Sequence, residues 1–153
     1  MNKDWTIVHM LKVKGARVKD RFIILIADKN HYVREFLQRE LVSEGYGVRQ
    51  AVNGKDILDQ IYSQESIDLI IIDPDMPGVD NAKLFKRFHD RIPSLPVIVH
   101  AHSEYDGIME KAYEWPFVEK NGNSIETLKQ KIADILKSDK KRVKDASDKL
   151  QGQ

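Results

Sequence analysis

Two short runs of apolar residues constrain the fold of this chain more than any other feature of its sequence. Phe22–Ala27 (FIILIA) contains no polar residue, and Ile67–Ile72 (IDLIII) contains a single one. A strand with one face in water alternates apolar and polar residues, whereas an unbroken apolar run indicates a strand that is covered on both faces. Strands of this kind are typical of parallel sheets with helices on both sides. The two runs therefore predict an α/β fold with a buried sheet.

Shorter apolar runs and segments of helical periodicity alternate along the rest of the chain. Further strands are expected at Val48–Val52, Pro96–Ala101 and Trp115–Glu119. Five strand–helix units in about 115 residues predict a doubly wound, five-stranded parallel sheet with helices on both faces. Ser124 is the expected N-cap of the last helix. The helices are expected around five clusters of apolar residues at helical spacing: residues 33–41, 57–61, 84–88, 108–112 and 125–135.

The chain is expected to form one domain with an extension at each end. At 153 residues it is long enough to bury a core without disulfide bonds or metal ions. The elements described above fall within residues 21–138. An N-terminal extension, 1–20, precedes this domain, and a basic C-terminal extension, 139–153, follows it.

The two ends of the chain are basic. Residues 1–21 carry six basic and two acidic side chains, and residues 137–153 carry six and three. The favoured explanation of this charge is that the ends are solvated and keep the protein soluble. Nucleic-acid binding is not expected, because no helix-turn-helix motif follows the domain. Val143, Ala146 and Leu150 keep helical spacing. The last helix therefore either continues through the C-terminal extension, where it could mediate dimers or contact a partner, or frays there.

Composition excludes several classes of protein. The absence of cysteine excludes a disulfide framework, a cysteine-ligated zinc site and a thiol nucleophile. No apolar run reaches the length needed to cross a bilayer, and the N-terminus lacks the pattern of a signal peptide. The expected localisation is therefore cytoplasmic, without a membrane partner.

Charged residues follow the expected strands where each strand ends. Asp28 and Lys29 follow the first strand, Asp73 and Asp75 follow the third, and Lys120 follows the fifth. Ligands of doubly wound sheets bind at the carboxyl ends of the strands, where the strand order reverses. Charges next to buried strands need each other or a ligand. These residues are therefore expected to form either a functional site or a structural cluster of ion pairs without turnover.

The motifs that hold these residues resemble the receiver domain of bacterial two-component response regulators. The resemblance is carried by IILIAD ending at Asp28, DLIIIDPDMPG around Asp73, PVIVHA ending at Ala101, and FVEKN with Lys120. It covers about residues 21–138. It implies a flavodoxin-like fold with the strand order 2-1-3-4-5.

The resemblance also implies a role for each residue of the site. Asp73 matches the aspartate that takes a phosphoryl group from a histidine kinase or a small phosphodonor, and Lys120 matches the lysine that contacts this group. Mg²⁺ is usually held by acids after the first strand, here Asp28, by the phosphoacceptor, and by a backbone carbonyl that here belongs to Asp75. Phe117 matches an aromatic residue that switches rotamer on activation.

Two residues depart from the family pattern, and both lie in the expected pocket. Lys29 stands where the family has a second acid, and Ala101 stands where it has Ser or Thr. Lys29 removes a metal ligand and adds a positive charge, so Mg²⁺ binding is expected to be weak or absent. The favoured interpretation is a degenerate pocket, or pseudo-receiver, in which the Lys29 ammonium takes the place of the metal beside Asp73. The alternative is a conventional phospho-switch that is still phosphorylated at Asp73.

The expected function is that of a signalling domain in a phosphorelay, acting through contacts with a protein partner. A histidine kinase or a downstream signalling protein is the expected partner, and a homodimer is a further candidate. By resemblance, the output face comprises the fourth helix, the fifth strand and the fifth helix.

Two other kinds of site fit the sequence less well. Asp73 and Asp75 are also similar to the start of a haloacid-dehalogenase phosphatase site, in which the first acid is the nucleophile and the second a general acid. Met76, the central position of the motif and the lack of a downstream acidic pair argue against it, so the chain is expected not to be an enzyme. His100 and His102 share a face of one strand and could bind a metal, but the sequence offers no obvious third ligand.

Overall fold

The computed structural model describes residues 21–152 except 79, 92, 108–110 and 112, and within its last helix it describes the backbone alone of residues 139–144 and 146. Five parallel strands form one sheet in the order β2-β1-β3-β4-β5, which confirms the predicted flavodoxin-like topology. The strands are β1 (Ile23–Ala27), β2 (Gly47–Ala51), β3 (Leu69–Ile72), β4 (Val97–Ala101) and β5 (Phe117–Glu119).

The most apolar strands occupy the middle of the sheet. Every residue of β3 and β4 is buried, and so are four of the five residues of β1. The edge strands β2 and β5 are more exposed, in accordance with their more polar sequences. The third strand begins two residues later than expected because Asp68 binds β1 from outside the strand: its Oδ2 accepts a hydrogen bond of 2.8 Å from the Ile23 N–H.

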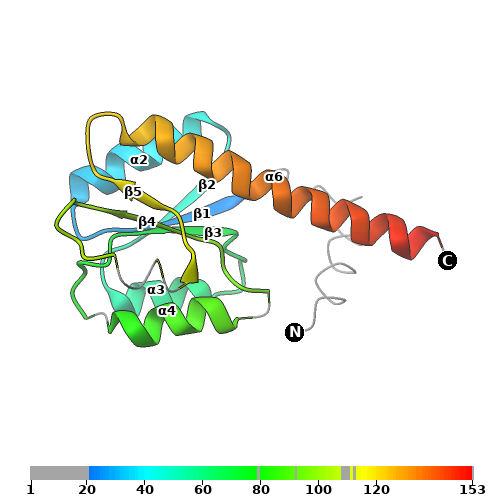
Figure 1. Ribbon diagram of the computed structural model, residues 1–153, viewed down its shortest axis with the longest axis horizontal. Helices are drawn as coiled ribbons and strands as arrows, with labels where there is room; N and C mark the ends of the chain where they lie inside the picture. Colours follow the sequence, from blue (N-terminus) through cyan, green and yellow to red (C-terminus); the bar gives the residue numbers. More distant parts are fainter. Residues whose placement is uncertain (1–20, 79, 92, 108–110, 112, 153) are drawn as a thin grey trace.

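Helices cover both faces of the sheet, as Figure 1 shows. On one face, Leu37 and Leu41 of one helix pack with Leu128, Ile132 and Leu136 of another. The opposite face is covered by apolar side chains of two further helices, among them Ile57 and Phe85. The first pair is α2 (His31–Ser43) and α6 (Ser124–Gln151), and the second pair is α3 (Gly54–Ile61) and α4 (Asn81–Asp90). The helix expected around residues 108–112 falls largely outside the described residues.

The last helix differs from the sequence prediction at its start. Ser124 is the first helical residue of α6, and Asn123 stands at the N-cap without a side-chain capping bond. The Ser124 hydroxyl instead lies 3.3 Å from Nε2 of His100 on β4. The prediction of Ser124 as the cap was therefore wrong, because its side chain bonds to a neighbouring strand.

At its other end, α6 continues without interruption to Gln151, a length of 28 residues. Of the two alternatives for the C-terminal extension, the backbone thus adopts the continuous helix. Within the part of the chain that the structure describes, no helix combines the length and apolarity needed to cross a membrane.

Candidate functional site

Two aspartates lie side by side at the carboxyl edge of the sheet. Asp28 follows β1 and Asp73 follows β3, and these two strands are neighbours. The Asp73 N–H donates to the carbonyl of Ala27 at 2.9 Å, which extends the ladder of hydrogen bonds by one residue. Asp28 and Asp73 are only 3% and 5% exposed. Two buried carboxylates this close together require a counter-charge.

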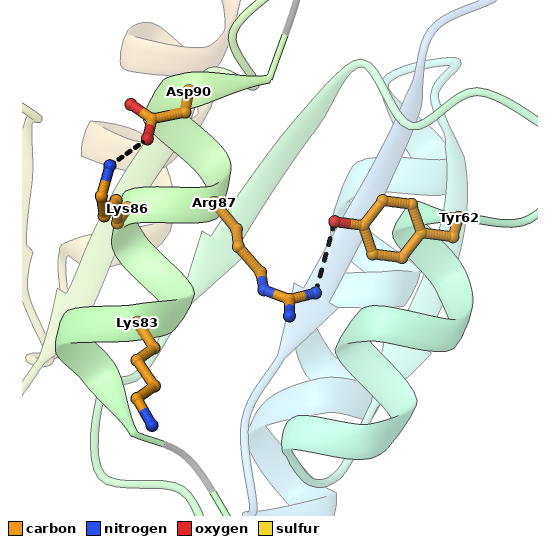
Figure 2. Close-up of a pocket in the computed structure, with 5 residues that line it drawn as sticks. All are labelled: Tyr62, Lys83, Lys86, Arg87 and Asp90. Carbon is orange, nitrogen blue, oxygen red and sulfur yellow. Dashed lines mark hydrogen bonds and ion pairs between the residues drawn. The ribbon is translucent and has the colours of Figure 1, made fainter.

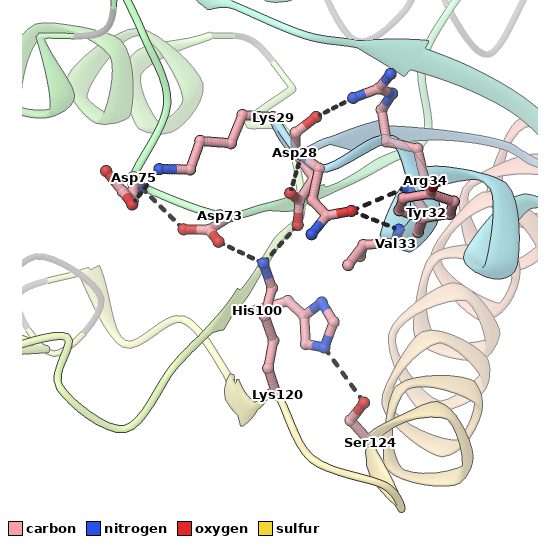
Figure 3. A network of polar contacts seen from close by, with 11 residues as sticks. Asp28, Lys29, Tyr32, Val33, Arg34, Asp73, Asp75, His100, Lys120 and Ser124 are labelled. Carbon is pink, nitrogen blue, oxygen red and sulfur yellow. Dashed lines mark hydrogen bonds and ion pairs between the residues drawn. The ribbon is translucent and has the colours of Figure 1, made fainter.

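Lys120 supplies that charge. It follows β5, and its N–H donates to the carbonyl of Ala101 at 2.8 Å. Its Nζ lies 2.6 Å from Oδ2 of Asp28 and 2.5 Å from Oδ2 of Asp73, and its side chain is 10% exposed. Figure 3 shows the ammonium group between the two acids. Burial works to lower the pKa of Lys120, but the hydrogen bonds to Asp28 and Asp73 outweigh it and the pKa is raised.

Backbone groups bind the remaining oxygens of both carboxylates. Oδ1 of Asp28 accepts a hydrogen bond from the Asn30 N–H at 2.8 Å. Oδ1 of Asp73 accepts one from the Asp75 N–H, also at 2.8 Å. Each carboxylate thus has one oxygen bound to Lys120 and the other bound to a backbone N–H of the loop that follows its own strand. All four carboxylate oxygens are engaged within the protein.

Lys29 lies elsewhere than the sequence led us to expect. Its Nζ is 2.6 Å from Oδ2 of Asp75, and the two side chains are 54% and 81% exposed. The ammonium beside Asp73 is therefore that of Lys120, and Lys29 closes a second ion pair at the mouth of the site (Figure 3). The hydrogen bond to Asp75 raises the pKa of Lys29, and the same bond lowers the pKa of Asp75. Asp28 and Asp73 attract the Lys29 charge more weakly.

The carboxylate oxygens that a Mg²⁺ ion would use at this edge already have partners within the protein. The buried acids use their oxygens for Lys120 and for backbone N–H groups. Mg²⁺ prefers an octahedral shell of oxygens that includes carboxylates and several waters. Among the described residues, no three acidic or imidazole side chains are grouped so that they could hold a metal ion. Asp75 borders the site through its backbone, and the role of its carbonyl as a metal ligand stays a prediction.

The two expected switch positions lie on the last two strands. Ala101 ends β4 and is 2% exposed. Phe117 begins β5 and is 37% exposed. Its ring stacks on that of Tyr105, with centroids 6.1 Å apart and an angle of 13° between the planes. Phe117 is thus held against the loop that follows β4.

Arg34 is a residue of the site that was not predicted from the sequence. This side chain is 8% exposed. Its Nη1 donates to the Asp28 carbonyl at 2.8 Å and its Nε to Oε1 of Gln50 at 3.0 Å. Arg34 therefore fixes the loop after β1. Its helical spacing could have indicated that it is buried, because Arg34 precedes Leu37 and Leu41 by three and seven residues on the buried face of α2.

His100 is a second buried polar residue near the site. It is 4% exposed. Its Nε2 contacts Ser124, and within the described structure its Nδ1 has no hydrogen-bond partner. Burial, reinforced by the charge of Lys120, lowers the pKa of His100 from 6.5 to about 4. The ring is therefore neutral at physiological pH and packs as part of the core.

A surface hollow lies away from this edge, between α3 and α4 (Figure 2). Its volume is about 450 Å³, and Tyr62, Lys83, Lys86, Arg87 and Asp90 line it. Lys86 pairs with Asp90, and Arg87 donates to the Tyr62 hydroxyl at 3.5 Å. None of the residues that the sequence singled out lies in this hollow.

Known proteins share both the sequence and the fold. Sporulation initiation phosphotransferase F of Bacillus subtilis (strain 168) is 36% identical over 88 residues, which are 57% of this chain and 70% of that protein. The DNA-binding transcriptional regulator NtrC of Escherichia coli (strain K12) is 34% identical over 95 residues. These are 61% of this chain but 20% of NtrC, so the chain spans about a fifth of that regulator.

A solved structure and a family profile agree with these relatives. The response regulator TrrA of Thermotoga maritima, in complex with the histidine kinase ThkA, has 29% sequence identity and a TM-score of 0.66, covering 75% of this chain and 98% of TrrA. The response regulator receiver domain family matches residues 24–133, which include every residue of the site described above. The chain therefore belongs to the response regulator receiver domain family.

Proposed function

We propose that this receiver domain signals in a phosphorelay through contacts with a protein partner, a histidine kinase or a downstream signalling protein. The relatives support this choice: the similar receiver TrrA forms a complex with the histidine kinase ThkA, and the similar Bacillus protein is a phosphotransferase of sporulation initiation. The same contacts could be made with a second copy of the chain.

We further infer that the phosphorylation pocket is degenerate. The observation that supports this inference most directly is the closed set of ion pairs: Lys120 binds both buried acids, and Lys29 binds Asp75 at the mouth. A divalent cation would have to displace Lys120 from the acids and would meet the positive charge of Lys29. Weak or absent Mg²⁺ binding is the expected consequence.

The degenerate pocket also bears on Asp73 as a phosphoacceptor. A carboxylate attacks phosphorus through a free oxygen, and a cation must neutralise the equatorial oxygens of the transferred group. Both oxygens of Asp73 are hydrogen-bonded, and Ala101 offers no hydroxyl to a phosphoryl group. We therefore expect phosphorylation at Asp73 to be slow or absent.

A conventional phospho-switch is the second candidate. One observation favours it: Lys120 lies 2.5 Å from Asp73, where it could also contact a phosphoryl group on that residue. In this version the Lys120 ammonium transfers from Asp28 and Asp73 to the phosphoryl oxygens.

A phosphatase of the haloacid-dehalogenase kind is disfavoured by Asp75. A general acid must hold a proton at neutral pH. The hydrogen bond and the charge of Lys29 lower the pKa of Asp75, so its carboxyl stays ionised. Asp75 is therefore unsuited to protonate a leaving group.

Restoring the missing acid tests the degenerate pocket. In Lys29→Asp, a carboxylate replaces the ammonium at the mouth, so Mg²⁺ affinity is expected to rise at least about tenfold. Isothermal titration calorimetry measures the affinity, and mass spectrometry after incubation with acetyl phosphate and Mg²⁺ measures phosphorylation of Asp73. We expect little phosphate on the natural chain and more on Lys29→Asp.

Lys55→Asp is the matched control. It makes the same change of charge at an exposed lysine of α3, on a side chain that is 85% exposed, and it should leave Mg²⁺ binding unchanged. Tight Mg²⁺ binding and stoichiometric phosphate on Asp73 of the natural chain would contradict the degenerate pocket and establish the conventional switch.

A further inference from the structure

Helix α4 carries a cluster of positive charge on a domain that is otherwise acidic. Between the two basic ends of the chain, residues 22–136 hold 13 basic and 19 acidic side chains. Lys83, Lys86 and Arg87 fall within five consecutive residues, and all three line the hollow between α3 and α4. The helix dipole favours a cation in the last turn, where Arg87 lies, but it disfavours Lys83 as the third residue of the helix. The dipole therefore does not account for the cluster.

Two of these cations have weak partners within the described structure. The Arg87 side chain reaches from α4 toward the end of α3 (Figure 2), where its Nη1 donates one long hydrogen bond of 3.5 Å to the neutral hydroxyl of Tyr62. A guanidinium carries five N–H donors. The Lys83 ammonium lies 4.0 Å from Oδ2 of Asp80, and the Lys83 side chain is 85% exposed. Arg87 and Lys83 thus retain donors for an anionic partner.

The acidic side chain of the hollow does not neutralise it. Of the five described residues that line the hollow, Asp90 is the acidic one, and it pairs with Lys86. Three cations therefore face one carboxylate. The acidic remainder of residues 22–136 repels an anionic partner, whereas the hollow attracts it. This contrast directs a negatively charged partner to the face formed by α3 and α4.

The chemistry of the hollow fits a protein segment better than a small molecule. Its volume of about 450 Å³ suits a ligand, but ligand pockets are lined mostly by apolar side chains, and four of the five side chains here are charged. Tyr62 is 66% exposed and contacts Arg87. Tyrosine and arginine are enriched among the residues that contribute most to binding at protein interfaces. The arginine fork matches the two oxygens of a carboxylate.

We propose that this hollow is a docking surface for an acidic segment of the signalling partner. The inference rests on the proposed function, in which the domain acts through a protein partner. One carboxylate of the segment binds Arg87, another binds Lys83, and the Tyr62 ring packs against the segment. The surface lies away from Asp73 and uses elements other than those of the expected output face. Docking is therefore expected without phosphate on Asp73.

An acidic peptide tests the proposal with the full-length chain. The probe is a short peptide of alternating glutamate and glycine, and its control is the same peptide with glutamine in place of glutamate. Heteronuclear NMR locates the binding site by residue and gives the dissociation constant. We expect the acidic peptide alone to shift the amide signals at the end of α3 and along α4. Its affinity should fall as added salt screens the charges.

Substitutions in the hollow separate the roles of charge, fork and ring. Arg87→Gln should weaken peptide binding about fivefold, and Arg87→Lys, which keeps the charge but not the fork, should weaken it less. Tyr62→Phe keeps the ring and should bind like the natural chain, whereas Tyr62→Ala should bind more weakly. Lys149→Gln removes a charge from an exposed lysine of α6 and is the matched control, with no effect expected.

Four results would overturn the proposal. Equal binding of the glutamine peptide would show that charge is not what the hollow recognises. Binding that Arg87→Gln leaves unchanged would place the site elsewhere. Inorganic pyrophosphate that displaces the peptide and binds more tightly would identify a phosphate-bearing ligand as the occupant. A dimer in analytical ultracentrifugation that Arg87→Gln dissociates would identify a second copy of the chain.

These tests are independent of the phosphorelay. The peptide assay requires neither a histidine kinase nor phosphate on Asp73. Failure of the peptide to bind would therefore refute the docking surface and leave the proposed function intact. Evidence against a phosphorelay would leave the result of the peptide assay unchanged.

Discussion

At the scale of single residues, the buried charges of the site depend on one ammonium group. Lys120 contacts Asp28 and Asp73, and all three side chains are at most 10% exposed. Removing one partner of a buried ion pair leaves the other without compensation, which is far more costly than losing an exposed pair. The same residue that offsets much of the negative charge of the pocket is therefore expected to stabilise the fold.

Lys120→Met should destabilise the protein. The substitution keeps most of the apolar stem but leaves Asp28 and Asp73 as an uncompensated buried pair, at a cost of about 3 kcal/mol at pH 7. Urea unfolding measures the free energy. Lys55→Met, at an exposed lysine, should change it by less than about 0.5 kcal/mol. Equal stabilities of the two variants would contradict the assigned role of Lys120.

His100 is expected to make stability depend on pH. Burial and then the charge of Lys120 lower its pKa from 6.5 to about 4. Between these values the unfolded chain binds a proton that the folded protein does not bind, so stability rises with pH. The free energy of unfolding should therefore fall by up to about 3 kcal/mol as the pH drops from about 6.5 to about 4.

A substitution isolates this contribution. His100→Leu removes the titrating group and should flatten the profile of unfolding free energy between about pH 6.5 and about pH 4. His89→Gln, at a side chain that is 58% exposed, should leave the profile unchanged. A profile of His100→Leu as steep as that of the natural chain would show that other groups are responsible.

At the scale of elements, the β1–α2 loop connects the site to its supporting helix. Asn30 caps α2: its Oδ1 accepts hydrogen bonds from the N–H groups of Tyr32 at 2.9 Å and Val33 at 3.3 Å. The Asn30 N–H donates to the Asp28 carboxylate, and the Arg34 side chain donates to the Asp28 backbone carbonyl. The start of α2 and the acid after β1 thus form one hydrogen-bonded unit.

Asn30→Ala should weaken this unit. The loss of the cap is expected to cost about 1 kcal/mol of stability, whereas Asn30→Asp, which keeps an acceptor oxygen, should cost much less. Chemical denaturation compares the two variants. A loss of equal size in both would show that capping is not what Asn30 contributes.

The elements were predictable wherever the local pattern was strong. The runs at β1 and β3 indicated central strands because a strand buried on both faces leaves no room for alternation. Ser124 was misassigned because its type suits a cap, and only the neighbouring strand reveals His100 as its partner. Arg34 was not predicted because an arginine is seldom buried in a helix unless it donates to a nearby acceptor. Here the acceptor is the Asp28 carbonyl, which only the structure identifies.

At the scale of the whole molecule, one sheet separates two apolar cores. Leu128 lies in the core between the sheet and the pair α2 and α6. Trp115 packs on the other side, with its ring centroid 5.2 Å from that of Phe85. The central strands contribute residues to both cores. The two layers should therefore unfold together.

Leu128→Ala tests this coupling in a Trp5→Phe background, in which fluorescence reports Trp115 alone. Truncation of a leucine that is 0% exposed should cost about 2–5 kcal/mol. The midpoints from Trp115 fluorescence and from circular dichroism should shift together, although the substitution is on the opposite face. Separate midpoints would show that the two layers unfold independently.

The convergence of the site was predictable from topology, but its pairing was not. Parallel strands bring their carboxyl ends to one edge, so Asp28, Asp73 and Lys120 had to lie close together. Which acid each lysine contacts depends on loop geometry and on the rotamers of long side chains, which a strand pattern does not encode. Lys29 accordingly pairs with Asp75, whereas the sequence suggested Asp73.

The position of Lys120 has a consequence for large-scale mutagenesis. Its ammonium links residues that follow β1, β3 and β5, so the chemistry of the pocket and the integrity of the sheet share one side chain. A screen that scores only cellular abundance would rank Lys120 with the core leucines, and it would pass substitutions at the exposed Lys29. Only a mutant library scored in parallel for cellular abundance and for signalling output would distinguish the role of Lys120 from that of Lys29.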